Sequence, residues 1–507
     1  MDQETVMKRF SSGGTFAGAL IAVMLLAPPQ NCWAQSVGTN PLAGRISIMN
    51  LGRRAAFDRP DERALQAVAP LAPKPGGGAY ILWATAEGWN RGFENVTSTV
   101  FVTEVDGQRN IVGDDINLGR GQPMSIVATN DGFACFVKDD HKLTLLKFAG
   151  HQRTGELVLM GHGNGTARPT TFRHGVDLRP LNNGQFPHGW AVPYAPFNRG
   201  HGGMAFGNGI IGATFGIWNN YQPSGHRPPD GNWSRPDDAH NGSTAWFFGN
   251  DPAQNYHMAY STGDHSLDQR MIFDGSSFYS LSLNPHLVFQ RFDSQGNRSA
   301  RTVLFDQPVK YVRQDGSTEA DDGAMEVQDR SGTWQRRTGF VEASGYTLGR
   351  LGDLHALGSD RFALTYGYAA WTNNRNLRSG KNQVDFAVLD GNGHVITRRI
   401  IAEADSRAGQ NGFTEYKPYE RIKWVKSVTA GNNILIVWAT EYHDLSRNYP
   451  TYMALVDVQG SIVSGPHAIP HDMARFSFND RLQALSDGTI AWTYTGNGSL
   501  WLYLLSP

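Results

Sequence analysis

The segment Gly431–Thr440, GNNILIVWAT, decides the fold class, because its pattern returns along the whole chain. A turn rich in Gly, Asp or Asn precedes a strand of mainly apolar and aromatic residues, the signature of a hairpin. Six further copies are GGGAYILWAT from Gly76, DGFACFV from Asp131, GNGIIGATF from Gly207, DGSSFYSLSL from Asp274, GSDRFALTY from Gly358 and DGTIAWTY from Asp487. One glycine per copy gives spacings of 54, 77, 66, 83, 73 and 57 residues. Such recurrence predicts a repeat architecture.

Each copy is flanked by further strand candidates. Short apolar segments such as MSIVAT, RMIF and RLQAL precede it, strands such as HLVFQRFDSQG follow it, and a fourth strand such as VITRRIIA completes most units. Several third strands end in Asp-x-x-Gly turns, at Asp293–Gly296, Asp390–Gly393 and Asp457–Gly460. Tight turns join antiparallel neighbours. Seven units of four strands predict an all-β, seven-bladed β-propeller with long loop insertions on one face, and the alternative is a pair of β-sandwiches.

The two ends of the chain suggest how the ring closes and where the protein acts. The last unit stops at its third strand, SLWLYLLSP, and a strand candidate at 44–50, GRISIMN, would supply the missing outer strand and remove an open edge. Residues 1–34 have the features of a secretory signal peptide: Lys8 and Arg9, the apolar run Phe16–Ala27, and a small residue at Ala34. The alternative is a retained membrane anchor. We therefore expect residues 35–507 to form one propeller domain, secreted or periplasmic and free of the membrane after signal removal.

Charge argues against nucleic acid as a partner. The chain has 45 Lys and Arg against 46 Asp and Glu, whereas phosphate contacts require a basic surplus. Cys135 would be the only cysteine after signal removal, and its apolar surroundings predict a small buried residue.

The long connections identify the functional face. In a propeller the first–second and third–fourth strand turns share one face, and here those turns are short. The long insertions at 162–200, 307–350, 218–242, 371–382 and 441–450 all fall among the other connections, and long insertions in a compact domain are commonly functional. Half of the 16 histidines lie between 162 and 265. Trp190, Trp218, Trp233 and Trp371 in these loops either stack on a ligand or pack the loops onto the scaffold.

Residues just before each innermost strand should point into the central channel on that face. They are Arg120, Gln122, His201, His265, Asp268, Gln269, Arg270, Arg350, Asp353, His355, Tyr419, Arg421, Lys423, Arg475, Asn479 and Arg481. A ring of arginines suits an anionic ligand, because guanidinium binds carboxylate, sulfate or phosphate in a fixed geometry. The alternative is a set of structural pairs such as Asp268–Arg270 or Asp353–Arg350.

Aromatic, Asn, Arg and His residues on one face predict an anionic polysaccharide or oligosaccharide as the partner, and β-elimination of a uronate needs such a set. A cation neutralises the carboxylate, a His or Tyr removes the neighbouring proton, and a second group protonates the leaving oxygen. In architecture and residue types the chain resembles the seven-bladed propeller polysaccharide lyases that cleave ulvan and related uronate polymers. That resemblance implies His, Tyr and Arg on the channel face, with a metal in some members; no lyase motif aligns, so it assigns no residue.

From the needs of the reaction we predict the following roles. Arg270 or Arg350 binds the carboxylate, His201 or His265 is the base, and Tyr260 or Tyr419 is the acid. Substrate-binding candidates are Arg120, Trp218, Asn219, Trp371, Arg421 and Arg481.

Two other functions stay open. Paired carboxylates among Asp264, Asp268, Asp353 and Glu441 would suit a glycoside hydrolase, and a non-catalytic sugar- or protein-binding propeller is the third alternative. No compact histidine motif selects a metal, so the cofactor is unknown and a divalent metal is compatible with the residues present.

Overall fold

The computed structural model describes residues 43–56, 69–87, 98–139, 142–160, 191–193, 203–219, 242–252, 256–261, 268–283, 287–304, 311–319, 325–328, 334–337, 349–369, 382–403, 420–442, 450–470, 472–477 and 480–506. All of them belong to the compact unit Cys32–Pro507. The 3-10 helix η1 (Ala43–Arg45) is the only helix among these residues. No helix in the described ranges is long and apolar enough to cross a membrane.

Seven antiparallel arrangements of four strands, the blades, follow one another along the chain. Blade 1 has β2 (Leu71–Pro73), β3 (Ala79–Ala84), β4 (Thr99–Val105) and β5 (Ile116–Arg120). Blade 2 has β6 (Gln122–Ala128), β7 (Gly132–Asp139), β8 (Lys142–Ala149) and β9 (Gln152–Met160). Blade 3 has β11 (Gly203–Gly207), β12 (Ile210–Asn219), β13 (Gly242–Phe248) and β14 (Tyr256–Ser261). Blade 4 has β15 (Asp268–Phe273), β16 (Phe278–Leu283), β17 (Leu287–Phe292) and β18 (Arg298–Leu304).

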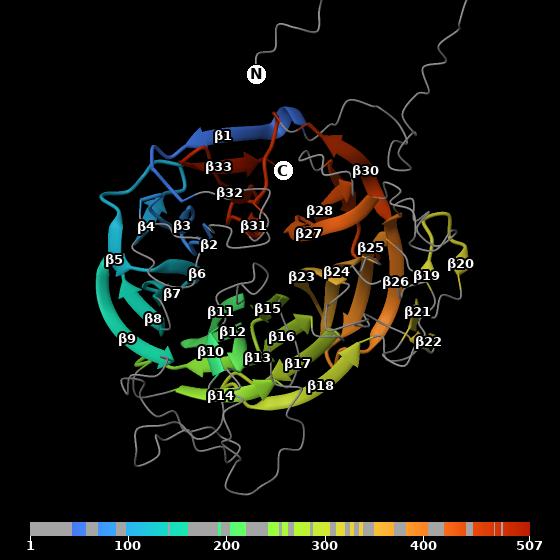
Figure 1. The fold of residues 1–507 in the computed structure, drawn as a ribbon, viewed down its shortest axis with the longest axis horizontal. Coiled ribbons are helices and arrows are strands. Elements are labelled where there is room, and N and C mark those ends of the chain that lie inside the picture. The colour runs from blue at the N-terminus through green and yellow to red at the C-terminus, as the bar shows by residue number, and fades with distance from the viewer. Residues whose placement is uncertain are drawn as a thin grey trace, which may run out of the picture. The chain divides into compact units, whose positions relative to one another are not determined.

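The remaining blades follow the same order. Blade 5 has β23 (Gly349–Gly358), β24 (Arg361–Ala369), β25 (Asn382–Asp390) and β26 (Val395–Glu403). Blade 6 has β27 (Glu420–Ala430), β28 (Asn433–Tyr442), β29 (Thr451–Val456) and β30 (Ile462–Ile469). Blade 7 has β31 (Gln483–Ala484), β32 (Ile490–Gly496), β33 (Ser499–Leu505) and β1 (Ile46–Asn50). The blades stand around a common axis with the first strand of each innermost (Figure 1). The predicted seven-bladed β-propeller is therefore confirmed.

Blade 7 is assembled from two distant parts of the chain. Strand β1 pairs antiparallel with β33, from Ile46 opposite Leu505 to Asn50 opposite Trp501. The outer edge of β33 is thus covered by a segment that precedes blade 1.

The core is divided among the seven interfaces between neighbouring blades. Each of the seven buried apolar clusters joins residues from two adjacent blades. In β24, Phe362, Leu364 and Tyr366 pack toward blade 4, whereas the intervening Ala363 packs toward blade 6. Successive side chains of a strand point to opposite faces, and here both faces are covered. That is why the second strands read as nearly continuous apolar runs; all six residues of β3 are buried.

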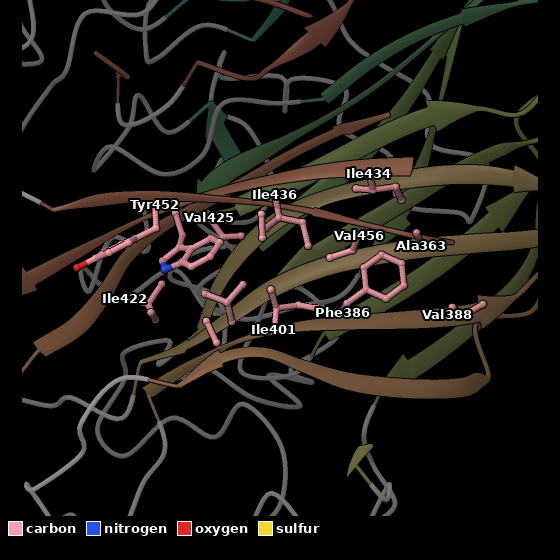
Figure 2. Packing of buried hydrophobic residues seen from close by; sticks show 14 residues of the cluster. Ala363, Phe386, Val388, Ile401, Ile422, Val425, Ile434, Ile436, Tyr452 and Val456 are labelled. Carbon is pink, nitrogen blue, oxygen red and sulfur yellow. The ribbon is translucent and has the colours of Figure 1, made fainter. Parts of the chain in front are cut away.

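Figure 2 shows the interface between blades 5 and 6. Phe386 and Ile401 of blade 5 lie beside Ile436 and Val456 of blade 6. Side chains of this size, buried at 0–4% exposure, contribute about 1.5–3 kcal/mol each through removal from water.

The predicted Asp-x-x-Gly turns are confirmed between third and fourth strands. Asp293, Asp390 and Asp457 each accept two backbone N–H groups through Oδ1, from the residues two and four positions ahead. The glycine three positions ahead has φ between 80° and 87° in all three turns. In blade 1 the equivalent position is occupied by Arg109, at φ 72°, so one turn carries a strained residue where its counterparts carry glycine.

Part of the 307–350 insertion lies at the outer edge of blade 5 rather than on the face expected to carry the long loops. Strand β19 (Tyr311–Val312) runs parallel to β26 at the outer edge of blade 5 and forms a hairpin with β20 (Thr318–Glu319) (Figure 1). Gln314 in this hairpin donates to the carbonyls of Ile400 and Gly460 and accepts from the Ile462 N–H. The hairpin therefore joins blades 5 and 6 from outside. A second hairpin pairs β21 (Met325–Gln328) with β22 (Trp334–Arg337).

Candidate functional site

Charged and polar side chains from four successive blades meet at the axis of the ring. Arg270 lies in β15, Asp353 and His355 in β23, Ser427 in β27, and Arg481 two residues before β31. These are the innermost strands of blades 4 to 7 (Figure 1). We call Arg270, Asp353, His355, Ser427 and Arg481, together with Gln269 and Thr365, the channel cluster.

Arg270 is held by internal partners. Its Nε lies 3.0 Å from Asp353 Oδ1 and donates to the Gly352 carbonyl at 2.6 Å. Its Nη1 donates to the Gln269 carbonyl at 2.8 Å, and its Nη2 to the Leu351 carbonyl at 2.9 Å. The side chain is buried. This guanidinium therefore fixes β15 against β23.

A β-bulge in β23 aims Asp353 at Arg270. The pairing with β24 shifts between Leu351 and Leu354, which leaves Gly352 and Asp353 opposite Thr365. The Asp353 N–H donates to Thr365 Oγ1 at 3.0 Å, and a Cβ on Gly352 would collide with Thr365. Bulges redirect side chains and recur beside functional sites.

Asp353 is ionised despite its burial. Burial alone would raise the pKa of its carboxyl, but Arg270 and Arg481 outweigh that effect and the pKa is lowered. The Ser427 N–H also donates to Asp353 Oδ2, at 3.2 Å. At neutral pH the group is a fixed carboxylate that cannot donate a proton, as the acid of a glycoside hydrolase must.

Arg481 crosses the channel. Its Nη2 donates to the Gln269 carbonyl at 2.9 Å, and its Nε lies 3.5 Å from Asp353 Oδ1. Blades 7 and 4 are not neighbours in the ring, so this contact spans the axis. The Arg481 side chain keeps 22% of its surface exposed, and it is the more accessible of the two guanidinium groups.

His355 is a neutral imidazole beside these charges. Its Nε2 lies 2.8 Å from Ser427 Oγ, which lies 2.6 Å from Thr365 Oγ1. Burial lowers the pKa of His355 to about 4; Asp353 opposes this shift, and Arg481 and Arg270 reinforce it. The side chain is half-buried, so it combines a fixed ring with access to solvent.

A second set of polar contacts, centred on Asp480, connects blade 7 to the segment that leads into blade 1. Asp480 Oδ1 accepts the Ala69 N–H at 3.0 Å, and Asp480 Oδ2 accepts the Ser477 hydroxyl. Lys426 donates to the Asp480 backbone carbonyl. Burial raises the pKa of Asp480 to about 6, against the lowering effects of Ser477, the Ala69 N–H and Lys426. This group ties the entry to β2 to the last blade.

The predicted site residues fall into three groups. Arg270 and Arg481 meet in the channel cluster, with Asp353, His355 and Gln269 from the wider predicted channel set. Arg350 and Arg421 are the second residues of β23 and β27, both innermost strands. Tyr260 lies in β14 and Arg120 ends β5, both outermost strands of their blades. Trp218 and Asn219 end β12. His201, His265, Tyr419 and Trp371 lie outside the described residues.

Two of the predicted insertions, 162–200 and 218–242, meet at blade 3. Strand β10 (Ala191–Pro193), within the 162–200 insertion, pairs with the end of β12, with Val192 opposite Trp218. The chain leaves β12 directly into the 220–241 segment. These two insertions therefore begin or pair at the same strand, β12.

Sequence reasoning missed Ser427, Thr365 and Asp480. The first two are hydroxyl residues inside apolar strands, and nothing in their spacing marks them. Asp480 and Arg481 are adjacent in sequence, and only Arg481 was expected in the channel. Within the described ranges no group of three or more His, Cys, Asp or Glu residues could hold a metal ion. Cys135 is buried, as predicted.

Comparison with known proteins adds a structural likeness only. No protein-family model matches the chain, and no curated protein sequence matches it. Among solved structures it is similar to a subtype N10 neuraminidase-like protein of A/little yellow-shouldered bat/Guatemala/060/2010. The sequence identity is 9%, the alignment covers 78% of this chain and 95% of the other, and the TM-score is 0.35.

Proposed function

We propose that this protein is an exported carbohydrate-active protein that binds an anionic uronate polysaccharide or oligosaccharide at the channel cluster and cleaves it by β-elimination. One observation supports this above all. The guanidinium groups of Arg270 and Arg481 come from separate blades and converge on the single carboxylate of Asp353. These three groups carry a net positive charge at the axis, which attracts an anionic ligand.

The chemistry of the cluster suits elimination better than paired-carboxylate hydrolysis. Elimination needs a cation near the uronate carboxylate and neutral groups that exchange protons. Arg481 supplies exposed positive charge for the uronate carboxylate. In this proposal the proton-exchanging groups are the predicted base, His201 or His265, and the predicted acid, Tyr260 or Tyr419. Asp353 is ionised between two arginines, so it does not serve as a general acid. Export is proposed from residues 1–34, and the balanced charge of the chain supports a saccharide rather than a nucleic acid partner.

The test is ultraviolet absorbance of unsaturated uronate during incubation with a panel of uronate polysaccharides, with and without chelator. The expected result is a rising signal with at least one polymer. Arg481→Gln should slow it about 10- to 100-fold, because a hydrogen bond to a charged group contributes about 1.5–3 kcal/mol. Arg153→Gln is the matched control, since Arg153 is an exposed residue of β9 paired with Glu156.

The outcomes separate three functions. A flat trace with polymer retained by the protein would replace the lyase with a binding module. Release of reducing ends without ultraviolet signal would indicate a hydrolase. Equal loss in Arg481→Gln and Arg153→Gln would remove the channel cluster from the site.

A further inference from the structure

A chain of hydroxyl groups ends at His355. The Asp353 N–H donates to Thr365 Oγ1 at 3.0 Å. Thr365 Oγ1 lies 2.6 Å from Ser427 Oγ, and Ser427 Oγ lies 2.8 Å from His355 Nε2. Thr365 and Ser427 are both fully buried, so water does not compete for these contacts.

The other contacts of each hydroxyl favour one direction for these hydrogen bonds. Thr365 Oγ1 accepts the Asp353 N–H, and its other contact, to the Asp353 carbonyl, is 3.5 Å long. The usual O–H···O separation is 2.7–2.8 Å, so the Thr365 proton points to Ser427 Oγ. The Ser427 proton then points to His355 Nε2.

The opposite direction would leave one buried hydroxyl with only a long, weak acceptor. If His355 Nε2 carried the proton, Ser427 Oγ would accept it and also border Thr365. The Thr365 or Ser427 hydroxyl would then have only the 3.5 Å contact to the Asp353 carbonyl among the described residues. An unsatisfied buried polar group costs about 1–3 kcal/mol. Nε2 is therefore the acceptor.

A neutral ring with Nε2 unprotonated carries its proton on Nδ1. The groups that act on the ring are Asp353, Arg481 and Arg270, and together with burial they lower its pKa to about 4. Within the described part of the chain, no hydrogen bond engages Nδ1. The ring keeps some exposure while its Nε2 side faces the fully buried Ser427, which leaves Nδ1 for the channel.

We propose that Thr365 and Ser427 lock His355 in its Nδ1–H tautomer, so that His355 is a neutral hydrogen-bond donor to the carboxylate of a uronate bound beside Arg481. This rests on the proposed function for the identity of the ligand. His355 binds the ligand in this arrangement, and Ser427 and Thr365 are positioning residues. A donor that stays neutral recognises an anion without adding to the positive charge of the two arginines.

The tautomer is read directly by long-range ¹H–¹⁵N spectroscopy of the histidine-labelled full chain at pH 7, without any ligand. The expected spectrum has an unprotonated Nε2 and a protonated Nδ1 for His355, identified by its loss in His355→Asn. Ser427→Ala should change the tautomer populations while far-ultraviolet circular dichroism stays that of the wild type. A protonated Nε2, or an imidazolium, would overturn the proposal.

Two substitutions at His355 test the donor. Asn places an amide N–H near the position of Nδ1, whereas Gln places it near Nε2. We expect His355→Gln to weaken binding of glucuronate or galacturonate about 10- to 100-fold, and His355→Asn to weaken it far less. Equal weakening by both would refute the donor role.

Titration with glucuronate separates this inference from the proposed function. A shift of the His355 Nδ1 signal on binding supports it. Binding detected by calorimetry with an unmoved Nδ1 signal refutes it, whatever the polymer assay gives. A correct tautomer with no binding of any uronate overturns the ligand assignment and the proposed function together.

Discussion

Asp480 should make the propeller less stable as pH rises through the weakly acidic range. The pKa of its carboxyl is about 6 in the folded protein against an ordinary 3.8. A raised folded-state value means that the native state holds the proton more tightly than the unfolded chain. The contribution of Asp480 to stability is then fully present below pH 3.8 and is lost as the pH rises to 6. A shift of about two pKa units corresponds to about 3 kcal/mol, and Asp480 is buried, so solvent screens little of it.

Asp480→Asn isolates this contribution. The amide keeps an oxygen for the Ala69 N–H and an N–H for Ser477 Oγ, but it does not ionise. The difference in unfolding free energy between the variant and the wild type should grow in favour of the variant by about 2 kcal/mol between pH 4 and pH 7. Urea unfolding followed by tryptophan fluorescence at each pH measures it.

The matched control is Asp487→Asn, in the turn between β31 and β32 of the same blade. Burial opposes the shift, but hydrogen bonds from Thr489 and the charge of Arg109 lower the pKa of Asp487. Its pH dependence should therefore have the opposite sign: ionised Asp487 stabilises the fold, and that contribution is lost as pH falls through its lowered pKa. A constant difference between Asp480→Asn and wild type, or a slope matching that of Asp487→Asn, would refute the reasoning.

Three further changes probe the scaffold. Asp385→Ala should lower the unfolding free energy by about 3–5 kcal/mol in denaturant unfolding, because it removes the carboxylate 3.0 Å from buried Arg398. The double change Asp385→Leu with Arg398→Met should recover most of this loss. No recovery would contradict the account. Arg109→Gly should leave the melting temperature unchanged or raise it. Arg109→Ala should have an unfolding free energy about 1–2 kcal/mol lower than that of Arg109→Gly, because alanine is strained at this positive φ. Equal effects would contradict the strain argument. Gln314→Ala should speed protease cleavage near 311–319; unchanged digestion would show that Gln314 does not hold the hairpin.

The fold was predictable because its signals are local. Alternating apolar residues and Gly- or Asp-containing turns specify each hairpin within about ten residues, and propeller blades repeat that hairpin. The third-to-fourth strand turns at Asp293, Asp390 and Asp457 followed from the same chemistry. The outer hairpin at 311–319 was not predicted there, because its parallel pairing with β26 depends on residues almost ninety positions apart.

The charged residues of the channel cluster could be predicted from the sequence, but the ion pairs between them could not. Placing residues before each innermost strand brought Arg270, Asp353, His355 and Arg481 into one set. The ion pairs considered from the sequence were within one strand, yet Asp353 contacts Arg270 and Arg481 from other blades. The bulge at Gly352 and the separation of neighbouring blades determine those contacts, and neither is encoded in local spacing.

Because β1 pairs with β33, the N-terminal part of blade 7 is synthesised long before its partner strand. Strand β1 ends at Asn50 and β33 begins at Ser499. At 5–20 residues per second, translation of the intervening chain takes roughly 20 to 90 s. Throughout that interval β1 has no partner strand, and blade 7 is incomplete. Blade 7 therefore cannot be completed before β33 has been synthesised.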